Sequence, residues 1–122
     1  MEEGSLKAAQ EVFDSAFAVP KVKQSPVYPI LLNEQATLLV YLGEEEQAFT
    51  MKKNVLPYLS QIKDLEKHIG IYNDLAILYR RWHMNDSTIY YYNKALDAAL
   101  KHKDESWITH IYNRDSRLIP SL

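Results

Sequence analysis

The sequence contains no cysteine, and this absence excludes several kinds of site at once. A chain of 122 residues without thiols has no disulfide scaffold, no thiolate metal centre and no cysteine nucleophile. Glycine is scarce as well. The three glycines stand far apart, so the sequence has no glycine-rich loop of the kind that holds phosphate groups. We therefore expect no cofactor.

An excess of positive charge is also missing. Fourteen basic residues stand against sixteen acidic ones, which gives a formal net charge of −2. Proteins that cover a nucleic-acid backbone usually carry a clear basic excess. We therefore expect no nucleic-acid partner.

Long apolar runs are absent too. The most apolar stretch, residues 27–42, is interrupted by Pro29 and by the polar residues 33–35, and it is too short to span a bilayer. The first residues are acidic and do not resemble a targeting signal. We expect no membrane insertion by this segment. The cytoplasm is the favoured compartment, and the periplasm is the alternative if the segment belongs to a membrane-anchored sensor.

Helical periodicity is what the sequence has in abundance. Apolar residues recur at intervals of three and four, without an alternating stretch that would indicate a strand. The clearest series is Leu65, Ile69, Tyr72, Ala76 and Tyr79. A second apolar stripe runs beside it, so this helix must pack against neighbours on two sides. The prediction is an all-α fold.

Start and stop signals divide the chain into about six helices within one domain, residues 1–122. We expect helix pairs at approximately 26–62 and 66–102, with flanking helices at 5–18 and 105–118. Ser25 and Pro26 are predicted to open the second helix, which stops at Gly43. The other predicted signals are caps at Asp64, at Asp86 or Ser87 and at Asp104, and a final stop at Pro120.

A forty-residue repeat links these helices. Residues 71–73, Ile-Tyr-Asn, recur at 111–113, and Leu-Leu-Asn stands at 31–33. The small residues Ala36, Ala76 and Ser116 share the same spacing. A small residue on the first helix of each unit lets the second helix approach closely. We expect repeated helix-turn-helix units that stack on one another.

The best-defined unit resembles a tetratricopeptide repeat. The positions of this family are filled by Tyr72, Leu75, Ala76, Tyr79, Tyr92, Ala95 and Leu96, with Thr88 where alanine is usual. The preceding unit fits at Leu32, Ala36, Leu39, Gly43 and Ala48, but departs at Gln35, Lys52 and Val55. Asp115 stands where the last unit would have leucine. The forty-residue period resembles the long-helix variety found in bacterial sensors and regulators. The resemblance implies a right-handed solenoid that binds proteins or peptides.

Three asparagines in register, Asn33, Asn73 and Asn113, are the first candidates for a binding site. Asparagine is a poor helix former, so three copies indicate a shared role. Two interpretations stay open: hydrogen bonds between neighbouring repeats, or contacts with an extended peptide backbone. The resemblance implies that helix residues at this place and one turn further line a peptide groove. Those further residues are Thr37, Ile77 and Arg117, followed by Arg80 and Arg81.

No catalytic or metal-binding arrangement is expected. The four histidines, His68, His83, His102 and His110, do not follow a ligand spacing, although His102 and His110 lie on either side of a predicted turn. The sequence has no GxSxG motif. Residues 90–92 are three tyrosines, which span about 200° of a helix. They cannot form one platform, so Tyr92 is predicted to lie in the core and at least one other to be exposed.

The sequence therefore predicts a binding module and not an enzyme. Arg80 and Arg81 are candidates to hold the carboxylate of an acidic partner, although basic residues at a helix end also complement the helix dipole. The alternative function is self-association into a homo-oligomer through the incomplete terminal helices.

Overall fold

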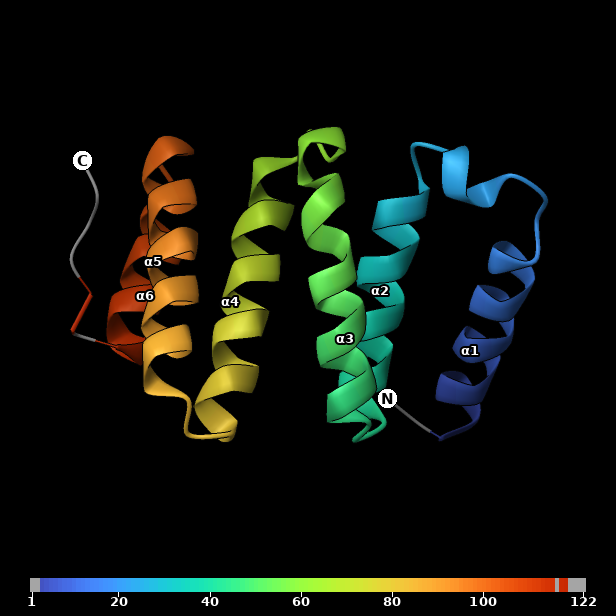
Figure 1. Ribbon diagram of the computed structural model, residues 1–122, viewed down its shortest axis with the longest axis horizontal. Helices are drawn as coiled ribbons and strands as arrows, with labels where there is room; N and C mark the ends of the chain where they lie inside the picture. Colours follow the sequence, from blue (N-terminus) through green and yellow to red (C-terminus); the bar gives the residue numbers. More distant parts are fainter. Residues whose placement is uncertain (1–2, 116, 119–122) are drawn as a thin grey trace. The chain divides into compact units, whose positions relative to one another are not determined.

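The chain is built from helices (Figure 1). The computed structural model describes residues 3–115, 117 and 118, and in these ranges it contains six α-helices, two 3₁₀ helices and no strand. This confirms the predicted all-α class. The elements are α1 (Glu3–Phe17), η1 (Val22–Gln24), α2 (Tyr28–Tyr41), α3 (Glu45–Val55), η2 (Leu56–Gln61), α4 (Leu65–Arg81), α5 (Asn85–Lys101) and α6 (Glu105–Arg114).

The chain divides into two compact units, unit 1 (Met1–Ile62) and unit 2 (Lys63–Leu122). Unit 1 contains α1 to η2, so the predicted pair at 26–62 corresponds to α2 and α3 with η2. Unit 2 contains α4 to α6, and the predicted pair at 66–102 corresponds to α4 and α5. The predicted flanking helices lie at α1 and α6. The grouping of both units into one domain stays a prediction.

The forty-residue period is visible in where the helices begin. Helix α3 begins at Glu45 and α5 at Asn85, while α4 begins at Leu65 and α6 at Glu105. The last two starts have the predicted caps. The Asp64 carboxylate accepts a hydrogen bond from the backbone of Glu66 at 3.0 Å, and the Asp104 carboxylate accepts one from Trp107 at 3.1 Å. Such side-chain caps satisfy amides that the first turn of a helix leaves free.

Three turns between helices share one backbone geometry. Each contains a residue with a positive φ angle: Gly43 at 79°, His83 at 58° and Lys103 at 56°. In each turn the next amide donates to a carbonyl five residues back, as in the 2.9 Å bond from Glu44 to Leu39. This is the Schellman pattern that ends a helix. The stop at Gly43 is therefore confirmed, and two turns place a side chain where glycine is favoured.

Other predicted helix ends are wrong. Ser25 accepts a hydrogen bond from the amide of Val27 at 3.3 Å, which forms a turn ahead of α2, and Pro29 instead of Pro26 occupies the first turn of that helix. Neither Asp86 nor Ser87 caps α5, because the preceding Schellman turn already fixes the start of that helix.

The last helix is shorter than expected. Helix α6 ends at Arg114, and Asp115 has an extended backbone with φ −152° and ψ 105°. The helix predicted at 105–118 therefore ends at Arg114, four residues earlier than expected. Pro120, the predicted stop, lies outside the described residues.

The core of unit 1 lies between α2 and α3. Its buried apolar side chains are Leu32, Ala36, Leu38, Leu39, Ala48, Val55 and Ile62. Helix α1 is attached differently, through a series of rings: Phe13 stacks on Phe17 at 6.5 Å, and Phe17 meets the edge of Tyr28 at 6.1 Å. Tyr28 in turn contacts Tyr58 of η2 at 5.7 Å. None of the α1 side chains from Gly4 to Phe17 is buried.

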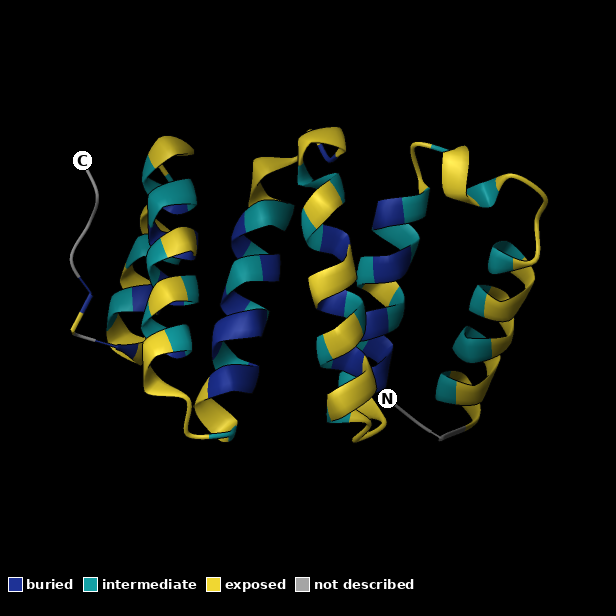
Figure 2. Cartoon of the chain, in the orientation of Figure 1, coloured by how far each residue is buried: buried dark blue, intermediate teal, exposed yellow. Residues whose placement is uncertain are grey.

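A cluster of buried apolar side chains joins all three helices of unit 2. Figure 2 shows buried residues on α4, α5 and α6. Ala76 has no exposed surface and lies in this cluster with Tyr92 and other residues of α5, as its small size predicts. The expectation for the tyrosines is confirmed, because Tyr92 is fully buried whereas Tyr90 is 54% exposed. Ser116, the third small residue of the series, lies outside the described residues.

Candidate peptide-binding surface

Two predicted site residues of unit 1 meet around a lysine that sequence reasoning did not select. Lys52 of α3 donates a 2.6 Å hydrogen bond from Nζ to Asn33 Oδ1 and a 3.2 Å bond to Thr37 Oγ1. Thr37 also donates to the backbone carbonyl of Asn33 at 3.1 Å. Asn33 and Thr37 therefore support the interior of unit 1.

Lys52 is only 1% exposed. An ammonium group removed from water needs hydrogen-bond acceptors, because the cost of burying an unpaired charge is large. The signal was present in the sequence: Lys52 follows Ala48 by four residues and precedes Val55 by three, and both neighbours are buried. A lysine in the middle of an apolar stripe indicates either a break in the helix or a buried cation. Here it is a buried cation.

The three asparagines do not form the expected regular series. Asn33 is half-buried and bonded to Lys52, Asn73 is 5% exposed, and Asn113 is exposed. The Asn73 Oδ1 atom is buried without a hydrogen-bond partner. No hydrogen bond in the described ranges joins two of these asparagines. The three asparagines therefore do not share one degree of burial, and the expectation that all three project onto one surface stays a prediction.

Exposed arginines gather at the ends of two helices in unit 2. The Arg80 Nη1 atom, in the last turn of α4, donates to the backbone carbonyl of Arg114 at 3.4 Å, so the ends of α4 and α6 lie close together. The Arg117 guanidinium holds the Asp115 carboxylate through bonds of 2.8 Å and 2.6 Å. The backbone amide of Arg117 donates to the same carboxylate at 3.0 Å.

Electrostatics agree with this arrangement. The hydrogen bonds from Arg117 lower the pKa of the Asp115 carboxyl, burial of the carboxyl opposes this shift, and the positive charge of Arg80 adds to the lowering. Asp115 therefore stays ionised, and one arginine is committed to neutralising it. Arg80 and Arg114 keep exposed guanidinium groups that can bind a second carboxylate.

We call this region the arginine surface and define it by Arg80, Asn113, Arg114 and Arg117, all of which are exposed. Arg81 is exposed at the same end of α4, and Ile77 is half-buried against the core of unit 2. The sequence contains four arginines, and all of them lie at or just beyond the ends of α4 and α6. Among the predicted site residues, Arg80, Arg81, Asn113 and Arg117 are exposed, Asn33, Thr37 and Ile77 are half-buried, and Asn73 is buried.

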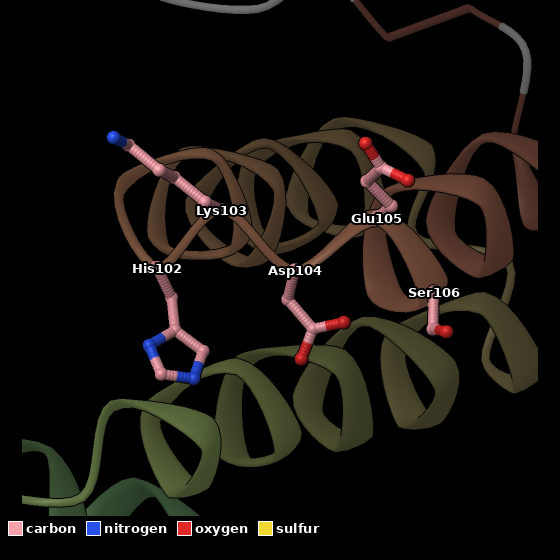
Figure 3. A pocket seen from close by; sticks show the side chains of 5 residues that line it. All are labelled: His102, Lys103, Asp104, Glu105 and Ser106. Atoms are coloured by element: carbon pink, nitrogen blue, oxygen red, sulfur yellow. The ribbon is translucent and has the colours of Figure 1, made fainter.

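The turn between α5 and α6 borders a shallow, open pocket of about 330 Å³ (Figure 3). Its lining side chains diverge: His102, Asp104 and Ser106 point to one side, and Lys103 and Glu105 to the other. The Asp104 carboxylate is already engaged as the cap of α6. Within the described part of the chain, no group of three or more His, Asp or Glu side chains could hold a metal ion. The side chains that line this pocket therefore do not point toward a common centre, as the groups of a catalytic site would.

Helices long and apolar enough to cross a bilayer are not found among residues 3–115, 117 and 118. The structure thus defines an all-helical protein of helix hairpins with a basic surface on unit 2. No family model, curated protein or solved structure matches the chain. The resemblance to tetratricopeptide repeats stays a prediction.

Proposed function

We propose that the chain is a non-catalytic module that binds an acidic segment of a protein or peptide through the arginine surface of unit 2. The observation that carries the proposal is the gathering of exposed arginines from α4 and α6 around one internal carboxylate, Asp115. Arginine suits this role because its planar guanidinium pairs with a carboxylate through two parallel hydrogen bonds.

The finer fold belongs to the same proposal. A right-handed, tetratricopeptide-like solenoid is supported by the forty-residue spacing of the helix starts. It is also supported by small or compact residues that are buried at equivalent positions, Ala36 with Ala76 and Ala48 with Thr88. In such an array, the module is a sensory or scaffolding part of a larger signalling or regulatory protein.

The test is a titration with a fluorescein-labelled hexaglutamate peptide, followed by fluorescence anisotropy. Arg80→Gln and Arg114→Gln should each weaken binding about two- to fivefold, as expected for exposed charge pairs. Added salt should weaken binding further because it screens exposed charges. Lys23→Gln, an exposed lysine of η1 in unit 1, is the matched control and should bind as the parent does.

Two results would count against the proposal. One is equal binding by the parent and by the Arg80→Gln, Arg114→Gln double variant. The other is an equal loss on Lys23→Gln, which would show that the peptide responds to net charge and not to this surface.

Self-association is the second candidate, and exposed apolar side chains of unit 1 favour it. Val12 of α1 is 68% exposed, Tyr41 is 67% exposed and Val19 is 55% exposed. Such side chains are available to a second copy of the chain. Light scattering over a concentration series tests this. Self-association is supported if the average mass of the parent rises with concentration and the Val12→Ser variant has a lower mass at the same concentration. A parent mass that stays at the monomer value would exclude self-association.

A further inference from the structure

Four tyrosines form a continuous aromatic contact between α4 and α5 of unit 2. Tyr91 stacks on Tyr79 at 5.4 Å with an angle of 10° between the rings, and on Tyr72 at 6.4 Å with an angle of 30°. Tyr90 meets Tyr91 edge-on at 5.0 Å, and the Lys94 ammonium lies 5.4 Å from the centre of the Tyr90 ring. We call these five residues the tyrosine surface.

Most of the tyrosine surface reaches solvent. Tyr90 and Lys94 are exposed, Tyr72 and Tyr91 are half-buried, and only Tyr79 is buried. Sequence reasoning missed this group because it considered residues 90–92 on one helix, whereas the stack is completed by α4. Tyr72 and Tyr79 are seven residues apart, so they stand two turns apart on one face, and Tyr91 enters between them.

The hydroxyl groups of this surface are hydrogen-bond donors. Burial raises the pKa of Tyr72, an effect that the nearby charge of Lys94 partly opposes. Burial also raises the pKa of Tyr91, and the neighbouring tyrosines add to the rise. Both phenols therefore stay protonated near neutral pH. Tyr90 is exposed and Tyr72 and Tyr91 are half-buried, so their side chains are accessible to a ligand that offers hydrogen-bond acceptors.

A complementary ligand must offer apolar rings together with unpaired carbonyl acceptors. Polyproline II segments have both, since their backbone carbonyls make no internal hydrogen bonds and proline has no backbone N–H that must be satisfied. Aromatic surfaces recognise such segments by packing against the proline rings. Tyrosine adds an O–H donor at the edge of each ring.

We propose that the tyrosine surface binds an extended, proline-rich peptide segment in the polyproline II conformation, with tyrosine hydroxyls donating to its carbonyl oxygens. This site shares no residue with the arginine surface, and its ligand does not need to be acidic. A phosphate group is the competing occupant, because hydroxyls and an ammonium also suit an oxyanion. Lys94 supplies only one positive charge here, however, and the rest of the surface is neutral, which favours the peptide.

The experiment is a titration of the ¹⁵N-labelled chain with acetylated, amidated decaproline, followed by amide chemical shifts. We expect saturable shifts confined to residues around the tyrosine surface. Tyr72→Phe, Tyr90→Phe and Tyr91→Phe keep the rings and remove one donor each, so each should weaken binding about three- to tenfold. Tyr28→Phe, a half-buried tyrosine of unit 1, is the matched control and should leave affinity unchanged.

Tyr90→Ala is the second variant, because this exposed ring can be removed without disturbing the buried core; it should weaken binding more than Tyr90→Phe does. The proposal is overturned by unsaturable shifts, by shifts centred elsewhere, or by Phe variants that bind like the parent. It is also overturned if inorganic phosphate produces the same shifts and displaces decaproline. The hexaglutamate titration tests the arginine surface, and the decaproline titration tests the tyrosine surface. A negative result in one does not change the expected result of the other.

Discussion

Lys52 and Asn33 form a 2.6 Å hydrogen bond inside unit 1, and the positions forty residues later hold Tyr92 and Asn73. In unit 2 the hydroxyl of Tyr92 and the Oδ1 atom of Asn73 are both buried, and neither has a partner. The same two positions therefore carry a satisfied polar pair in one unit and an unsatisfied one in the other. This difference gives each residue a distinct contribution to stability.

Asn33→Ala should lower the free energy of unfolding by about 1–3 kcal/mol, because it removes an acceptor from a buried ammonium. Asn73→Ala should cost less, since its Oδ1 atom accepts no hydrogen bond. Urea unfolding followed by circular dichroism measures both. The exposed Asn54→Ala on α3 is the control for a change of helix propensity alone. An Asn33→Ala variant as stable as Asn54→Ala would show that Lys52 does not depend on this bond.

Tyr92→Phe should be neutral or should raise the free energy of unfolding by up to about 1 kcal/mol, because an unsatisfied buried hydroxyl is costly. Trp82 and Trp107 are the two tryptophans of the sequence, and both lie in unit 2, so tryptophan fluorescence reports the unfolding of this unit. Tyr41→Phe, at a position that is 67% exposed, is the control. A clear loss of stability on Tyr92→Phe would mean that the hydroxyl has a partner in solution.

The parts of the fold that depend on local signals were predictable from the sequence. Asp64 and Asp104 cap helices because a carboxylate at that position reaches an amide two or three residues further on. Gly43 ends α2 because a positive φ angle is easy for glycine. Ala76 and Tyr92 were placed in the core from their spacing alone, and both have no exposed surface.

Features that depend on a second helix were not predictable. The spacing around Lys52 left a helix break and a buried cation as alternatives, and the acceptors on α2 decide between them. The stack of Tyr91 on Tyr72 and Tyr79 follows from how α4 and α5 pair. The start of α5 is set by the turn before it, so Asp86 does not act as its cap despite a suitable residue type. The three asparagines differ in burial for the same reason, because identical spacing does not give identical depth in the packed helices.

Lys103→Gly should raise the free energy of unfolding by about 0.5–1 kcal/mol. A left-handed backbone conformation is strained for a residue with a Cβ atom, and glycine removes this strain. Lys101→Gly is the matched control: the same change inside the last turn of α5 should cost up to about 1 kcal/mol. His83→Gly should behave like Lys103→Gly. Urea unfolding followed by tryptophan fluorescence gives the sign, and a destabilised Lys103→Gly would refute the prediction.

Asp115→Asn should destabilise unit 2 at pH 7 and have little effect near pH 2. The folded state holds the pKa of Asp115 below its ordinary value of 3.8, so the carboxylate contributes stability above that value. This contribution is lost as the pH falls through the lowered pKa. Unfolding midpoints of the parent and variant at several pH values measure the effect, with the exposed Asp86→Asn as control. A difference independent of pH would exclude the charge of Asp115 as its cause.

The ring of Phe17 contacts Tyr28 of α2, and helix α1 buries none of its side chains from Gly4 onward. Opening such a helix exposes little apolar surface, so local opening requires much less free energy than unfolding of the α2–α3 hairpin. Amide hydrogens of α1 will therefore exchange with water during these brief openings, whereas amides near Ala36 and Ala48 will exchange when the unit unfolds. A protease will remove α1 first and leave the hairpin folded.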